Sequence, residues 1–179
     1  MFGDTEQRNC ETALLTELSD QLRLCRDPGE AGSVIARYAG QLFPAASGAL
    51  YVRHDDGFYE LAASWGGFPV VSGDGAFSPY ECLAIRQGRA HGHAGPDAGS
   101  ICNHLGRGEA EPPCQSQRYL CLPIVTQEGD VPGILHLRCR ARAELSSAPF
   151  SMLSTFRLAM IVVGHMASSL TKQRSPHND

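Results

Sequence analysis

The sequence lacks the features that would place the protein in a membrane, outside the cell or on nucleic acid. Its N-terminal residues, MFGDTEQRNCETALL, contain neither the positively charged nor the apolar segment of a secretory signal peptide. No stretch approaches the roughly 18 apolar residues of a membrane-spanning helix, and RLAMIVVGHMASSL contains His165. The formal net charge of -4 gives no broad positive field for nucleic acid or anionic lipid. We therefore expect a cytoplasmic protein that binds neither membranes nor nucleic acid.

Signatures of common enzyme classes are also missing. The sequence has no G-x-S-x-G nucleophile elbow, no P-loop and no G-x-G-x-x-G after a strand. These absences favour a role that is not catalytic.

Cysteine, by contrast, is abundant in a chain that does not need disulfides. The 179 residues correspond to about one domain, with 42% hydrophobic and 19% charged residues. A domain of this size buries about 70% of the surface of its unfolded chain, so its core is sufficient for stability. An odd number of cysteines, seven, without an export signal indicates free thiols in a reducing compartment. Metal binding and redox chemistry then become the functions to test.

Hydrophobic periodicity predicts an α+β domain with an antiparallel sheet backed by helices. Residues 1–10 are expected to be a flexible N-terminus, residues 11–172 a single domain and residues 173–179 a polar tail. The CLAIRQG segment predicts a short helix ended by a glycine, and RAHGHA predicts a brief strand. The predicted long elements are helices at Glu11–Cys25, Glu30–Leu42 and Pro149–Lys172, and strands at Ala49–Arg53, Tyr59–Ser64, Tyr119–Thr126 and Gly133–Arg138.

Several segments carry a resemblance to a known family, and they are LSDQLRLCRDPGEAGSVIARYAGQLFPAASGALYV, LAASWG, FSPYECLAIRQGRAH, CNHL, YLCLPI and GILHL. Together these segments resemble the GAF domain, a sensing module of bacterial signalling proteins. They are most similar to a subgroup found ahead of diguanylate cyclase (GGDEF-type) domains, and the similarity covers nearly the whole chain. One departure is Leu83, where the subgroup usually has tryptophan.

The resemblance implies a sheet of about six strands, with the N- and C-terminal helices on one face and a loop-covered ligand pocket on the other. It implies a non-catalytic sensor of bacterial cyclic di-GMP signalling that binds a small molecule or a metal. It also implies a homodimer formed through the terminal helices, which would pass the signal to a downstream domain or protein.

The segment Glu81–Leu105 concentrates cysteine and histidine in a way that suggests a metal or thiol centre. Alternation in RYLCLPI places Cys121 on the sheet face opposite the leucines, where it would meet residues of this segment. Thiolate and imidazole together suit zinc or iron, and ligand atoms should then lie within about 4 Å of one shared point. The predicted metal ligands are Cys82, Cys102, His104 and Cys121, with His91 or His93 as alternative or additional ligands.

Other interpretations of these residues stay open at this stage. A thiol redox switch uses the same cysteines, and ordinary core packing accounts for buried cysteine in many proteins. Haem or an iron–sulfur cluster is a further option for Cys/His ligation. Some GAF proteins reduce methionine sulfoxide with pocket cysteines, and others bind a bilin. His136, opposite Leu135 and Leu137 on its strand, is expected to be a hydrogen-bonded histidine more often than a ligand.

Overall fold

The computed structural model describes residues 2–44, 46–67, 75–93, 102–105 and 117–140, together with Val162 and Met166. Two helices, a hairpin, a short helical segment and a second hairpin follow one another along these residues. The elements are α1 (Phe2–Leu24), α2 (Pro28–Leu42), β1 (Ala46–Arg53), β2 (Tyr59–Trp65), the 3-10 helix η1 (Pro79–Glu81), α3 (Leu83–Gln87), β3 (His91–His93), the 3-10 helix η2 (Asn103–Leu105), β4 (Gln117–Ile124) and β5 (Gly133–Arg140).

The strands form one antiparallel sheet in the order β2-β1-β5-β4-β3. Both predicted hairpins are confirmed, and their turns contain Gly57 and Gly129 with positive φ angles of 88° and 83°. The brief strand at His91–His93 is also confirmed, and it pairs with β4 at the edge of the sheet. The described residues contain five strands, compared with about six implied by the resemblance.

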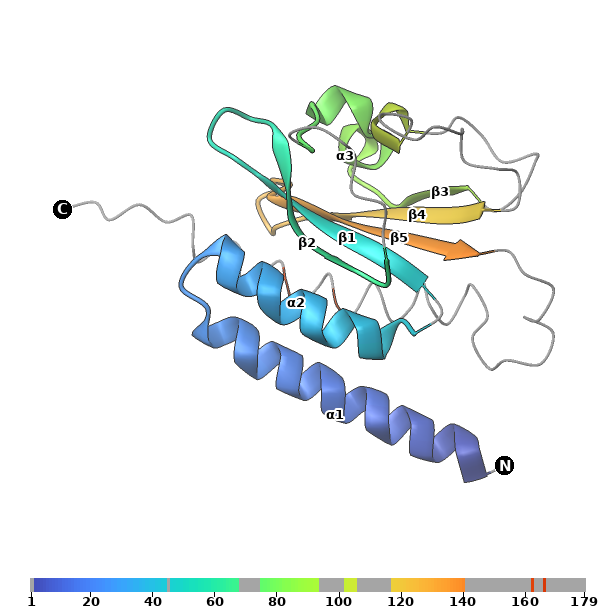
Figure 1. Ribbon diagram of the computed structural model, residues 1–179. Coiled ribbons are helices and arrows are strands. Elements are labelled where there is room, and N and C mark those ends of the chain that lie inside the picture. Colours follow the sequence, from blue (N-terminus) through green and yellow to red (C-terminus); the bar gives the residue numbers. More distant parts are fainter. Residues whose placement is uncertain are drawn as a thin grey trace.

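One face of the sheet is covered by helices, as predicted. Figure 1 shows α2 lying against the sheet and α1 lying beyond it, and α2 contacts both β1 and β2. Most of the predicted helix Pro149–Lys172 lies outside the described residues. Its two described members, Val162 and Met166, are helical and buried in the same cluster as Leu18 and Leu22 of α1. The two terminal segments therefore contact the same core.

The opposite face carries a second buried cluster that includes α3 and most of the predicted site. The predicted alternation along β4 is confirmed, because Leu122 and Ile124 belong to the helix-side cluster, whereas Tyr119 and Cys121 belong to the second cluster. Figure 1 shows α3 on this side of the sheet. The second cluster is thus where cysteines from separate segments meet aromatic side chains.

The helix boundaries differ from the predicted ones at their N-terminal ends. Helix α1 begins at Phe2 and not at Glu11, and α2 begins at Pro28 and not at Glu30. The Asp27 side chain accepts a hydrogen bond from the Glu30 backbone N–H at 2.9 Å, which fixes the start of α2. None of the described helices is long and apolar enough to cross a membrane.

Candidate metal centre

Strand β4 supplies the central residue of the candidate site, Cys121. Its side chain is fully buried. In the antiparallel register, Cys121 lies directly opposite His136 of β5 on one side and His91 of β3 on the other. Directly opposed residues of an antiparallel pair share a face of the sheet. The Sγ atom of Cys121 lies 3.2 Å from Nδ1 of His136, so this cross-strand pair is in direct contact.

Cys82 and Cys102 reach Cys121 from the segments above the sheet. Cys82 is the N-cap residue of α3, held in place by the capping box of Ser78 and Glu81 at η1. Cys102 lies just before η2; its backbone N–H donates to the Tyr119 hydroxyl at 3.3 Å. Its Sγ accepts a hydrogen bond from the Leu83 backbone N–H at 3.3 Å, which ties the residue to the start of α3.

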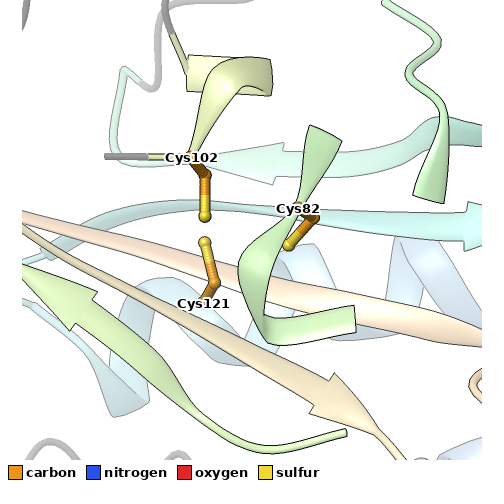
Figure 2. Close-up of side chains that lie close together, drawn as sticks. All are labelled: Cys82, Cys102 and Cys121. Carbon is orange, nitrogen blue, oxygen red and sulfur yellow. The ribbon is translucent and has the colours of Figure 1, made fainter. Parts of the chain in front are cut away.

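The three sulfur atoms come together in a buried group. In Figure 2 the side chains of Cys102 and Cys121 point toward one another, with Cys82 beside them. All three residues are buried, and their Sγ atoms lie within 4.8 Å of one another. Three atoms so placed all lie within about 2.8 Å of some common point, close to the Zn–S distance of about 2.3 Å. A metal ion therefore needs only a small contraction of this group.

His104 faces the same sulfur atom and is held in one orientation. Its Nδ1 lies 3.3 Å from the Glu81 carbonyl oxygen, which only accepts hydrogen bonds, so Nδ1 carries the proton. In the neutral ring Nε2 then has a free lone pair, and it lies 3.8 Å from Cys121 Sγ. The ring stacks on Phe77 with a centroid distance of 4.5 Å. A histidine oriented through one nitrogen by a carbonyl is the usual arrangement of a metal ligand.

His136 is the residue that the sequence did not assign to the site. It is fully buried, and its ring stacks on Tyr119 with a centroid distance of 5.9 Å. The ligand atoms of His136, His104 and Cys121 also lie within 4.8 Å of one another. The strand pattern placed His136 on the correct face, but only the register of β4 with β5 places it opposite Cys121.

The charges of the group are distributed unequally. Hydrogen bonds from Cys121 and Cys82 lower the pKa of Cys102 well below its ordinary value. The hydrogen bond to Cys102 is the main factor that raises the pKa of Cys82, to about 12, and burial raises the pKa of Cys121. Burial also lowers the pKa of His136, so its imidazole is neutral at physiological pH. Cys102 is therefore the thiol of this group that loses its proton most readily, because its two neighbouring thiols donate hydrogen bonds to it.

The remaining cysteines and histidines lie away from this group or outside the described residues. His91 is half-buried on the edge strand and belongs to neither set of mutually close ligand atoms. The side chains of His93 and Cys139, and all of Cys114, lie outside the described residues. Cys25 donates from Sγ to the Gln21 carbonyl at 3.3 Å.

A separate cleft of about 450 Å³ opens beside α3, between the two hairpin turns. Its walls include Arg53 and Asp130, which form an ion pair with N–O distances of 2.6 and 2.8 Å. Tyr59 lines the same cleft and donates its hydroxyl proton to the Val131 carbonyl at 2.6 Å. In this wall Arg53 and Asp130 are therefore already paired with each other, and the Tyr59 hydroxyl is already bound to the backbone.

No family model and no curated protein matches the sequence. Solved structures do match. The GAF domain of a phosphoenolpyruvate-protein phosphotransferase from Coxiella burnetii is 16% identical, with a TM-score of 0.63 over 92% of this chain and 95% of that one. The nlh2 GAF domain of A. aeolicus in an inactive state is also 16% identical, with a TM-score of 0.61 over 92% and 97%.

The chain has a GAF-like fold. The resemblance seen in the sequence is confirmed at this level. A third GAF-like neighbour is a type II free methionine-R-sulfoxide reductase from Thermoplasma acidophilum, 15% identical with a TM-score of 0.54 over 87% of this chain and 96% of that one. At these identities the likeness concerns the fold.

Proposed function

We propose that this GAF-like domain is a non-catalytic sensor that binds a soft metal ion through its buried Cys/His group. The observation that carries the proposal is that two thiols and an imidazole converge on the thiol of Cys121, from segments far apart in the sequence. Cys82, Cys102 and Cys121 would bind the ion as thiolates, with His104 as the neighbouring imidazole. Zinc and iron are the metals that this donor set favours.

The position of the group suggests how binding is passed on. Cys82 begins α3, Cys102 precedes η2 and Cys121 lies in the sheet, so one ion would fasten both helical segments to β4. Loss of the ion would release them, which is an order-to-disorder switch of a known kind. The change would reach the terminal helices through β4, because Leu122 packs in the helix-side cluster while Cys121 faces the site.

We further propose that the terminal helices form a homodimer and act on a downstream signalling domain or protein in the bacterial cytoplasm. The sequence resemblance to the GGDEF-associated subgroup supports cyclic di-GMP signalling as the context. Leu24, at the end of α1, is 73% exposed and provides apolar surface for a partner helix. Sedimentation equilibrium tests the dimer, and a monomer at high protein concentration would contradict it.

The metal proposal is tested by measuring the metal content and the absorption spectrum of protein purified under reducing conditions without chelator. We expect bound zinc or iron in the unaltered chain and a lower metal content in Cys102→Ser. Cys25→Ser is the matched control, because the serine hydroxyl can replace the thiol as donor to Gln21. Zinc gives no visible colour, whereas haem or an iron–sulfur cluster does. A metal-free protein that also fails to bind added zinc would reject the proposal.

A second function, reduction of free methionine sulfoxide, is favoured by one observation. Three buried thiols lie within 4.8 Å of one another in a fold that is shared with a free methionine-R-sulfoxide reductase. The test is the loss of methionine-R-sulfoxide with dithiothreitol as reductant. Turnover that is abolished by Cys102→Ser, in protein without bound metal, would favour the enzyme over the sensor.

A further inference from the structure

Resting on the metal-binding function proposed above, we propose that the centre holds two metal ions bridged by the Cys121 thiolate. One ion would be bound by Cys82, Cys102 and Cys121. The other would be bound by Cys121, His104 and His136. His136 is thereby assigned as a ligand.

The first half-site follows from the three sulfur atoms alone. They lie within 4.8 Å of one another and come from a helix start, a loop and a strand, so they surround a point instead of lining one element. All three residues are buried, at 0–1% exposure, which removes competing water ligands. Three thiolates make this half the softer one, suited to zinc or another thiophilic ion.

The second half-site shares the Cys121 sulfur with the first. Cys121 Sγ lies 3.2 Å from His136 Nδ1 and 3.8 Å from His104 Nε2, and the three ligand atoms are within 4.8 Å of one another. The two imidazole rings are nearly perpendicular, with an interplanar angle of 84° and centroids 6.0 Å apart. The proton on His104 Nδ1 is engaged by the Glu81 carbonyl, so Nε2 is the nitrogen available to an ion.

The case for two ions rests on how the five donors divide. Among the described residues they form two mutually close sets, and Cys121 is the member common to both. A single ion bound by all five would require donors of one set to move toward the other. A thiolate sulfur has three lone pairs and binds two ions at once, so one shared residue completes both sets. Two-metal sites in proteins commonly have their ions about 3.5–4 Å apart.

Cobalt(II) is the probe that separates one ion from two. Protein stripped of metal and reduced is titrated with Co²⁺, and the thiolate-to-cobalt charge-transfer absorption and the electron paramagnetic resonance signal are followed. We expect saturation at two ions per chain. We also expect the resonance signal per cobalt to fall as the second ion binds, because a thiolate bridge couples the two spins. This measurement needs no substitution, so it does not depend on whether a variant at buried His136 folds.

Substitutions then assign the two half-sites. His136→Ala is expected to bind one ion, Cys82→Ser is expected to bind one ion, and the control Cys25→Ser is expected to bind two. Saturation of the unaltered chain at one ion, or two ions in His136→Ala, would overturn the bridged pair while leaving the metal sensor intact. Two ions with fully independent resonance signals would also overturn the bridge. Failure to bind any ion would instead reject the proposed function itself.

Discussion

Gly48 in β1 lies between Trp65 of the helix-side core and the backbone of His136, a residue of the candidate site. A Cβ atom at this position would overlap the Trp65 ring and come within 2.7 Å of the His136 carbonyl oxygen. Trp65 in turn stacks on Phe43 and is buried, so it has little room to move. Only glycine leaves room for both the Trp65 ring and the His136 backbone at this position.

We therefore expect Gly48→Ala to destabilise the fold by about 1–3 kcal/mol, the usual range for overpacking a dense core. Gly40→Ala is the matched control, because Gly40 lies in α2 with nothing within 4 Å of a Cβ atom. Alanine is the better helix former by about 0.5–1 kcal/mol, so this variant should be as stable as the unaltered chain or more so. Urea denaturation measures both, and equal midpoints for the two variants would contradict the expectation.

Buried tyrosines on the site face make stability depend on alkaline pH. Burial raises the pKa of Tyr51 from 10.0 to about 12. The folded chain therefore keeps this proton where the unfolded chain has lost it, so the stability from this group is full below pH 10 and is lost as pH rises toward 12.

We expect the urea midpoint to fall between pH 10 and pH 12, and Tyr51→Phe to make the fall shallower. The fall should persist in part, because burial raises the pKa of Tyr59 as well. Tyr80→Phe is the control, since Tyr80 is 80% exposed. An identical pH dependence in Tyr51→Phe and the unaltered chain would show that ionisation of Tyr51 does not limit stability.

The positions of the histidines show that sequence alone does not decide which residues face one another across a sheet. Alternation along a strand has a period of two, so it predicted that Cys121 and His136 leave the leucine face. It says nothing about which residues stand opposite each other, because register depends on pairing between distant segments. His91 does lie opposite Cys121, but on the edge strand, and its half-exposed ring stays outside both sets of donors.

Among the helices and strands, α2 has the clearest local interaction that fixes where it begins. The Asp27 side chain caps it by accepting the Glu30 N–H, and the Glu30 side chain accepts the Arg26 N–H at 2.8 Å. We expect Asp27→Ala to lower the free energy of unfolding by about 1 kcal/mol, the typical loss for an N-cap.

Asp20→Ala in α1 is the control for this prediction. Asp20 forms an exposed ion pair with Arg23 at 3.8 Å, with both side chains more than 60% exposed. Such pairs contribute about 0–1 kcal/mol, so the control should lose less than the cap variant. Thermal or urea unfolding compares the two, and an equal loss would mean that the cap does not determine the stability of α2.

Element boundaries were less predictable than element identity. The sequence predicted a helix from Glu11 because the residues before it show no helical spacing of apolar side chains, yet α1 extends back to Phe2. A helix continues into polar sequence where nothing breaks it, and no apolar pattern records that extension. The C-terminal end of the short helix α3 was predicted correctly from the glycine that follows it. Gly88 adopts the left-handed backbone conformation that commonly ends a helix.

For the whole molecule, the decisive property is how strongly metal binding stabilises the fold. The donors of the candidate centre come from the start of α3, from η2 and its preceding residue, and from β4 and β5. Bound metal would therefore connect segments separated by up to 54 residues, between Cys82 and His136. An ion that binds only the folded chain stabilises it by about 2.7 kcal/mol at a hundred times its dissociation constant. For a chain of this length, that corresponds to a rise in Tm of about 5–10 °C.

We therefore expect added zinc to raise the Tm of the reduced, metal-free chain by this amount and a chelator to reverse the rise. The rise should persist in Cys25→Ser and be smaller in Cys102→Ser, since Cys102 is one of the three mutually close thiols. Calorimetry with and without zinc provides the measurement. If Cys102→Ser responds to zinc as strongly as the unaltered chain does, the stabilising ion binds elsewhere, and the buried thiols of this face serve packing.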